Sequence, residues 1–379
     1  MMNWEEYWWN NITGPQQVIR SVVDGLLDKK PVILRVPSDL PWRHTMRRCI
    51  EALIKERHSA MDIGVRFIDV VDMKIGDADP GKFLLERFAL REVQNGYRSR
   101  SGQTIQNYLI KQDVLKNLVI WVKGLNEAQT EKWIKFCRDY KCKDLNHGLF
   151  VIECSQYPKE VDIGTMARVT FSDHVRQYDL QLFNSILLDS QIVYNDDWKR
   201  YVAVLASHLC VNDAEVSELY IRLCDFKQEE PIIGFEKVLE CGEFERRGAD
   251  EGSTHILALC RHQDIEELDR RIWAAQLLVL FPLIELRRTQ IIAQLHDDIE
   301  KCLLTGQIKQ YGEVIYDPAD VEFGTLVYMM AKTDDYGYRV FYVPDEKLRD
   351  EIHFLRDCRN TLAHGSACTV SQAKQILGD

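Results

Sequence analysis

The sequence has few prolines and no long apolar run. It contains 10 prolines and 46% hydrophobic residues among 379, a composition that excludes extended disorder. The longest apolar stretch, residues 273–284, includes Gln276 and Pro282. It is far shorter than the roughly 20 residues that a membrane-spanning helix needs. We therefore expect a globular chain of two or three domains without a membrane partner.

Paired cysteines are also missing. The 11 cysteines are odd in number and irregular in spacing, and the closest pair, Cys137 and Cys142, is not a CxxC. This pattern indicates free thiols rather than disulfides, and without paired His/Cys ligand spacing we expect no metal and no cofactor. The first residues lack the basic and then apolar layout of a signal peptide, so a cytoplasmic protein is expected.

The chain lacks a basic excess. Its 48 Lys and Arg residues stand against 59 Asp and Glu residues, for a net charge of -11. From Asp250 to the end, 22 acidic residues stand against 14 basic ones. This balance excludes a sequence-independent grip on nucleic acid over the whole surface, so any such binding must use a local cluster.

What is present first is a repeated α/β pattern. Short β-branched runs alternate with helix-length amphipathic segments, as in a parallel sheet covered by helices. The expected strands are residues 31–36, 65–71, 118–122, 148–153 and 167–171. Before them, Trp4, Tyr7 and Trp8 share one face of an expected helix. We expect that face to dock against the domain rather than to stack on bases.

Beyond residue 173 the β signal disappears. Residues 180–188 and 198–209 read as helices, and the Gly-rich, charged stretch 242–253 is the best candidate for an interdomain linker. The expected domains are therefore an α/β domain (1–173), a helical lid (174–241) and a helical bundle (254–379).

The bundle is read from helix periodicity and end signals. Residues 264–304 form one amphipathic stretch with an expected kink at Pro282. Asp317 and Pro318 are expected to open a helix that runs to Met330. The last expected helix runs from Asp345 to about Ala363, and Gly365 follows it.

The order of strands and helices resembles the core of AAA+ and STAND-type P-loop NTPases, which also carry a helical lid. A working P-loop needs glycines whose backbone N–H groups wrap the phosphates, a Lys, and a hydroxyl for magnesium. Residues 38–45 offer only the hydroxyl of Thr45, with Arg43 and His44 as partial substitutes for the Lys. The third strand is followed by Lys123 instead of acidic residues. The resemblance implies a degenerate domain that does not hydrolyse nucleotide; an unrelated α/β domain is the alternative.

A second motif lies at the end of the last helix. The residues Arg359-Asn360-Thr361-Leu362-Ala363-His364 match the RNxxxH form of the Rx4-6H motif of HEPN domains. That family comprises helical bundles found in ribonuclease toxins and in RNA-cleaving effectors of prokaryotic defence systems. Arg359 also falls on the apolar stripe of Leu348, Ile352, Leu355 and Leu362, where a buried guanidinium must find an anion or a second subunit.

The HEPN resemblance implies a metal-independent endoribonuclease. It assigns Arg359 to charge stabilisation, His364 to acid/base chemistry and Asn360 to orienting both. Arg349 and Arg356 on the same helix are expected to contact RNA phosphates. The family's sites face each other across a dimer, so we expect a homodimer formed through the bundle.

Together the two resemblances indicate a toxin-like effector of antiviral defence, controlled by the NTPase-like domain and by a possible regulatory protein partner. The alternatives are an inactive pseudo-ATPase and HEPN-like scaffold, or a true ATPase with an incidental Arg/His pair.

Overall fold

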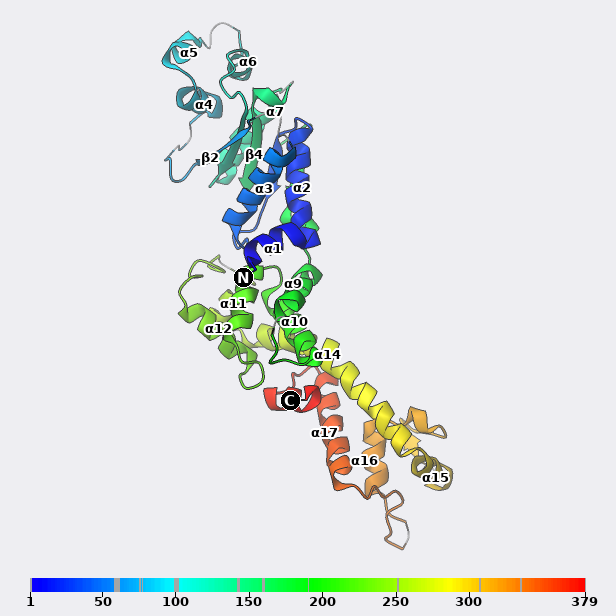
Figure 1. Cartoon of the computed structure of the whole chain (residues 1–379). Helices are drawn as coiled ribbons and strands as arrows, with labels where there is room; N and C mark the ends of the chain where they lie inside the picture. Colours follow the sequence, from blue (N-terminus) through cyan, green and yellow to red (C-terminus); the bar gives the residue numbers. More distant parts are fainter. Residues whose placement is uncertain are drawn as a thin grey trace. The chain divides into compact units, whose positions relative to one another are not determined.

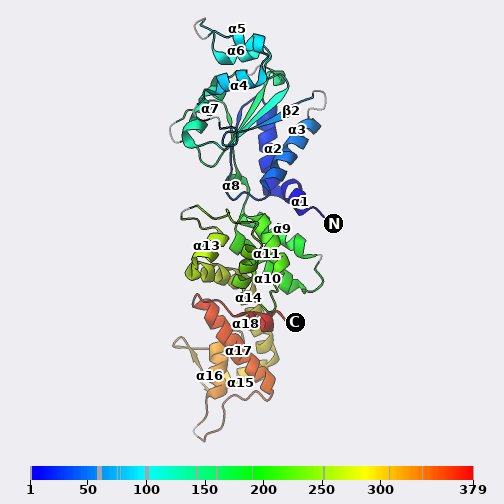
Figure 2. The same ribbon diagram turned by 90° about the vertical axis from the view of Figure 1, so that its left-hand side faces the viewer.

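The computed structural model describes residues 2–57, 62–74, 76, 78–98, 102–141, 144–158, 161–189, 191–250, 252–306, 308–334 and 336–378. The chain divides into two compact units (Figures 1 and 2). Unit 1 comprises residues 1–183 and 212–215, and unit 2 comprises residues 184–211 and 216–379. No helix in these described ranges is long and apolar enough to cross a membrane.

Unit 1 is built on a five-stranded parallel sheet in the order β2-β3-β4-β1-β5. The sheet confirms the parallel arrangement and all five expected strands. The central strands β3 and β4 are largely buried, so both faces of the sheet must be covered there. The strands are β1 (Val32–Arg35), β2 (Gly64–Asp69), β3 (Leu118–Lys123), β4 (Leu149–Cys154) and β5 (Ala167–Thr170).

Helices cover both faces of this sheet, as Figure 2 shows with α2 and α3 on one side and α7 on the other. Helices α4, α6 and α7 contribute to one continuous core with Ile33, Ile120 and Ile152 of the strands. The helices of unit 1 are α1 (Trp4–Asn11), α2 (Thr13–Leu27), α3 (Arg43–Arg57), α4 (Pro80–Phe88), α5 (Arg91–Gly96), α6 (Ile105–Lys111), α7 (Glu127–Asp139) and α8 (Phe171–His174), with the 3-10 turn η2 (Leu145–His147).

The N-terminal aromatic residues pack inside unit 1, as expected. Trp8 and Trp9 are fully buried. The rings of Trp4 and Trp8 meet Phe183 edge to face, with centroids 5.9 and 5.4 Å away. These indoles therefore anchor α1 and are not a base-stacking surface.

Unit 2 contains the remaining helices, and α9 crosses the boundary between the units. They are α9 (Gln177–Asp189), α10 (Asp196–Cys210), α11 (Ala214–Leu223), α12 (Pro231–Glu240), α13 (Ile256–His262), α14 (Ile265–Gln294), α15 (His296–Gly306), α16 (Phe323–Ala331), α17 (Glu346–Ala363) and α18 (Val370–Leu377). A short hairpin, β6 (Lys309–Gln310) with β7 (Glu313–Val314), and the 3-10 turn η3 (Pro318–Asp320) precede α16.

The expected lid and bundle share one core. The amide of Gln276 on α14 donates to the Tyr201 hydroxyl on α10 and to the Cys368 carbonyl ahead of α18, and Cys368 N–H donates back to it at 2.6 Å. Arg271 on α14 donates to the carbonyls of Leu209 and Thr254. Because these polar groups are buried, they fix the two segments together. Residues 184–211 and 216–241 of the expected lid therefore lie in one compact unit with the expected bundle.

The described residues of the expected linker, 242–250, 252 and 253, are folded as part of unit 2. Phe244 is buried, and the Arg261 guanidinium of α13 donates to the carbonyls of Phe244 and Arg247. Its glycines allow tight turns rather than a free hinge, with Gly248 at φ 67°.

Two expected helix boundaries are wrong. Asp317 caps only the 3-10 turn η3 through the Ala319 N–H, and α16 begins later, at Phe323. The stretch expected as one helix continues through Pro282 and divides at Leu295, where α14 ends and α15 follows. Helix α17 begins after its Asp345 cap and ends before Gly365 at φ 84°, as expected.

Candidate functional site

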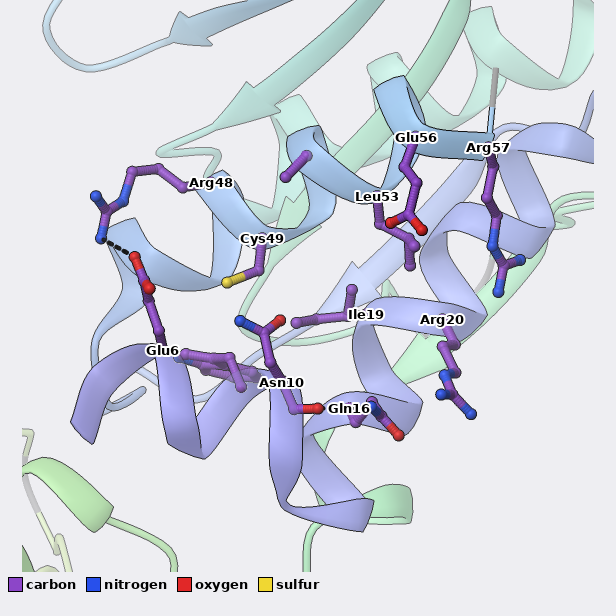
Figure 3. Close-up of a pocket in the computed structure, with 12 residues that line it drawn as sticks. Glu6, Asn10, Gln16, Ile19, Arg20, Arg48, Cys49, Leu53, Glu56 and Arg57 are labelled. Carbon is purple, nitrogen blue, oxygen red and sulfur yellow. Dashed lines mark hydrogen bonds and ion pairs between the residues drawn. The ribbon is translucent and has the colours of Figure 1, made fainter. Parts of the chain in front are cut away.

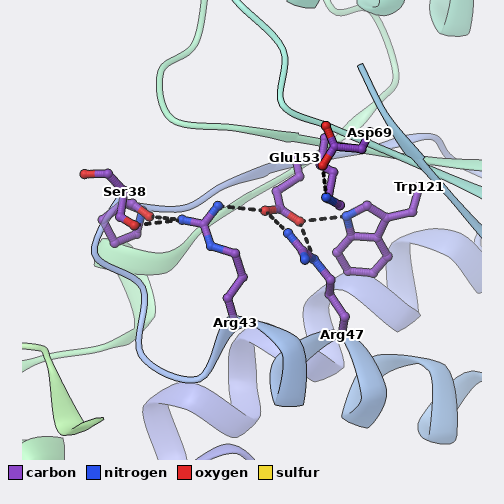
Figure 4. Close-up of polar contacts among 8 residues, drawn as sticks. Ser38, Arg43, Arg47, Asp69, Trp121 and Glu153 are labelled. Carbon is purple, nitrogen blue, oxygen red and sulfur yellow. Dashed lines mark hydrogen bonds and ion pairs between the residues drawn. The ribbon is translucent and has the colours of Figure 1, made fainter. Parts of the chain in front are cut away.

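The carboxyl ends of parallel strands are where open α/β sheets bind ligands. In unit 1 this edge contains the loop between β1 and α3, together with the last residues of β2, β3 and β4. Figure 4 shows that its polar side chains point toward one another.

The loop after β1 is filled by the chain's own arginine. The Arg43 guanidinium donates to the carbonyls of Pro37 (2.6 Å) and Ser38 (3.1 Å) and pairs with Glu153 at 3.1 Å. An anion-binding loop points its N–H groups at the ligand. This loop instead turns carbonyl oxygens toward a cation, so its polarity is opposite to that of a phosphate loop.

A carboxylate of the chain already occupies the start of α3. The Trp42 N–H donates to the Glu215 carboxylate at 2.8 Å, and Trp42 holds φ at 41°. Helix N-termini favour negative charge. Glu215 therefore supplies internally the anion that a P-loop would take from a nucleotide.

Glu153, at the end of β4, is the centre of this cluster. It is only 3% exposed. Arg47 binds it through two hydrogen bonds of 2.7 and 3.0 Å, and the Trp121 indole donates to it at 2.8 Å. Bidentate, charge-assisted bonds of this kind are strong and geometrically specific.

The neighbouring strand ends are neutralised as well. Lys123 at the end of β3 pairs with Asp69 at the end of β2. The bond from Lys123 holds the pKa of the Asp69 carboxyl below its usual value. A lysine thus stands where a P-loop NTPase needs acidic residues for metal and water.

The other residues expected in the nucleotide loop lie elsewhere. Thr45 is buried and donates its hydroxyl to Glu5 of α1 at 2.5 Å, so it does not face the loop. His44 is exposed. Arg43, expected to replace the P-loop Lys, is committed to the loop carbonyls and Glu153.

Sequence reasoning missed Arg47, Glu153 and Glu215. The available signal was Glu153 itself, a carboxylate at the end of an otherwise apolar strand, since such a charge must be paired.

A separate pocket of about 610 Å³ lies among α1, α2 and α3, as Figure 3 shows. Arg48 and Glu6 lie at one end and Arg20 and Arg57 at the other, with the half-buried Cys49 between them. Burial raises the pKa of the Cys49 thiol.

In unit 2, Arg359 is compensated by two carboxylates. Its guanidinium lies 3.7 Å from Glu285 of α14 and 3.5 Å from Glu322, and 5.9 Å from the Phe281 ring centroid. Both distances exceed those of hydrogen-bonded ion pairs. The Tyr311 hydroxyl donates to the same Glu322 at 2.8 Å, and this contact raises the pKa of Tyr311.

The stripe of α17 differs from the expected one. Its buried residues are Leu348, Ile352, Leu355, Cys358 and Leu362. Cys358 fills the position expected for Arg359, because a 3.6-residue period brings either residue close to the stripe. Arg359 lies on the flank, with 27% of its side chain exposed. The expected cost of an uncompensated buried charge therefore does not arise.

The remaining motif residues lie at the exposed end of α17. Asn360 and His364 are exposed. They stand four residues apart, on the face that Arg356 also shares. Within the described residues, no hydrogen bond or ion pair joins Arg359 to His364. The structure thus groups Asn360 with His364 and places Arg359 against α14.

The two arginines expected at phosphates have partners in their own chain. Arg356 donates to Asp357, and Arg349 donates to the carbonyls of Val343 and Pro344. To bind a phosphate, Arg356 must break its ion pair with the exposed Asp357. Breaking such a surface ion pair costs little free energy. Arg349 instead secures the start of α17.

The order of the parallel strands and the additional helical region define an α/β protein with a P-loop-like sheet. Neither a protein-family model nor a curated protein matches the chain. Two solved structures are similar to it. The ORC2 protein of Aeropyrum pernix, in ADPNP–ADP complexes, has a TM-score of 0.32 and 12% identity over 91% of this chain and 93% of its own. The Aeropyrum pernix ORC1 protein in complex with DNA has a TM-score of 0.33 and 10% identity over 94% and 85%. Because both TM-scores are low, the class rests on the sheet and not on these likenesses.

Proposed function

We propose that the chain is a metal-independent endoribonuclease whose catalytic unit is the C-terminal helical region and whose P-loop-like domain does not hydrolyse nucleotide. The observation that carries the proposal is the exposed pair of Asn360 and His364 at the end of α17. An exposed imidazole there can reach an RNA 2'-hydroxyl and act on its proton. A role in antiviral defence, as a toxin-like effector, is part of this proposal.

Cleavage assays test the activity directly. Purified full-length chain incubated with mixed RNA in EDTA should yield products with 2',3'-cyclic phosphate ends, since acid/base chemistry on the 2'-hydroxyl needs no metal. Activity that appears only with added metal would contradict the proposed chemistry.

The second candidate is a catalytically inactive scaffold. It is favoured by the two carboxylates that already compensate Arg359. A scaffold needs no free guanidinium, so RNA would remain intact in the same assay while the fold stayed unchanged.

Nucleotide should not bind the loop after β1. Calorimetry with Mg-ATP is expected to show no micromolar binding, because the loop presents carbonyls and Glu215 occupies the start of α3. Arg43→Ala is expected to create no binding, since the carbonyls and Glu215 remain. A micromolar isotherm accompanied by phosphate release would show that the loop opens and functions.

A homodimer through unit 2 is expected. Arg359 and His364 are five positions apart, about one and a half helical turns, and therefore point in different directions within one chain. A second copy can bring the two groups to one scissile phosphate.

Sedimentation should show a dimer at tens of micromolar. Mixing Arg359→Ala with unmodified protein should lower activity beyond simple dilution, and a strict monomer with full activity would refute the shared site.

A further inference from the structure

Exposed tyrosines gather in one stretch of unit 2. Between residues 311 and 342, six tyrosines are each more than half exposed: Tyr311, Tyr316, Tyr328, Tyr336, Tyr338 and Tyr342. The last four belong to the end of α16 and to the segment that follows it. We call residues 328–334 and 336–342 the tyrosine hairpin. Figure 1 shows this segment extending past the ends of α16 and α17.

The backbone of the hairpin directs two rings outward. Thr333 and Arg339 form an antiparallel bridge, and the Asp334 carboxylate accepts the N–H groups of Tyr336 (3.0 Å) and Tyr338 (2.8 Å). Gly337 between them adopts φ 84°, a conformation that suits glycine. The rings are consequently held at the tip, with Tyr336 86% and Tyr338 73% exposed.

The large exposed apolar side chains of the hairpin are its four tyrosines, while Ala331 is exposed and Val340 half-buried beside them. Phe341 and Val343 are buried and secure its base. Protein-docking patches usually combine rings with other apolar side chains in a packed centre. This surface offers mainly ring faces, and no large aliphatic side chain is exposed among its described residues, which suits a flat partner.

Cationic groups accompany these rings. The Lys332 ammonium lies 5.9 Å from the Tyr328 ring centroid, and Arg339 is exposed beside the tip. Asp334 and Asp335 balance them in formal charge. Stacking, rather than net charge, must therefore supply most of any affinity. Stacking on the tyrosine rings would therefore allow the acidic unit 2 to bind a nucleic acid at this surface.

We infer that the tyrosine hairpin binds single-stranded nucleic acid by stacking successive bases on Tyr336 and Tyr338, with Arg339 meeting a backbone phosphate. Base–aromatic stacking is tolerant of sequence because every base has a π-face. The inference adds a substrate-binding surface to the proposed ribonuclease. It can be tested by binding alone, without cleavage.

A DNA ligand separates binding from cleavage, because it has no 2'-hydroxyl. Fluorescence anisotropy of the full chain with a labelled oligothymidine of about 12 nucleotides measures the affinity. The double variant Tyr336→Ala and Tyr338→Ala should bind at least about ten-fold more weakly, since each stack contributes about 5- to 150-fold. Both rings are solvent-exposed, so this variant should keep the fold.

Three further arms make the test specific. The double Tyr→Phe variant should retain affinity, because it keeps both ring faces, and Tyr178→Ala, an exposed tyrosine of α9 in unit 1, should bind normally. An abasic strand of equal length and charge should bind at least about ten-fold more weakly than oligothymidine. Equal binding of the abasic strand, or unchanged affinity of the double alanine variant, would overturn the inference. Loss of affinity in the Phe variant would do so as well.

Discussion

Glu153→Ala is expected to destabilise unit 1 by about 3–5 kcal/mol, the usual effect of removing one partner from a buried ion pair. The Arg47 side chain, 8% exposed, would lose both of its bonds to the carboxylate, and the Trp121 indole would lose its acceptor. Domains are stable by only about 5–15 kcal/mol. The loss would therefore appear as a large shift of the urea midpoint measured by circular dichroism.

A matched control separates burial from charge. Glu131→Gln removes a carboxylate whose pair with Lys135 on α7 is solvent-exposed, and it should change stability by less than about 0.5 kcal/mol. Replacing both partners, as Glu153→Leu with Arg47→Met, should recover much of the loss because no charge is left buried and unpaired. Equal midpoints for Glu153→Ala and Glu131→Gln would contradict the role given to Glu153.

The sheet is predictable from sequence because its signal is local. Each strand is a short segment that contains β-branched residues, and β4 is buried along its whole length. The contacts that fill the loop between β1 and α3 are not predictable in this way. Arg43 meets Glu153 across 110 positions, and Trp42 meets Glu215 across 173. The sequence predicts that the loop lacks the glycines and the lysine of a P-loop, but only the fold shows that the loop turns carbonyl oxygens toward Arg43.

For the proposed C-terminal site, the helix that carries the motif is predictable from sequence, and the contacts of its residues are not. Capping residues located α17 correctly, since a cap acts within one turn. The capping residue Asp317 did not mark the start of an α-helix, because a 3-10 turn can begin with the same kind of cap. The partners of Arg359 were hidden because Glu285 and Glu322 come from other segments, and helical periodicity cannot decide between neighbouring positions such as Cys358 and Arg359.

His364→Ala is expected to lower the rate of RNA cleavage about 100-fold or more, the contribution of one acid/base residue. His364 is exposed and its backbone N–H bonds to the Asn360 carbonyl, so an alanine there should leave the urea midpoint unchanged. Single-turnover cleavage in EDTA measures the rate. An unchanged rate would remove His364 from the site.

Arg359→Ala separates the ribonuclease from the scaffold. As the charge-stabilising residue, Arg359 should contribute about 100-fold or more to the rate. Its ion pairs are long and partly exposed, so stability should fall by less than about 1 kcal/mol.

Arg288 is the matched control, since it pairs with Glu285 at 2.8 Å and also donates to the carbonyls of Ala319 and Val321. Arg288→Gln should therefore lower stability and leave the rate per folded molecule intact. Because Lys cannot reproduce the planar fork of a guanidinium, Arg359→Lys should recover only part of the rate. If Arg359→Ala instead behaves like Arg288→Gln, the guanidinium only joins α17 to α14, and the scaffold is the correct function.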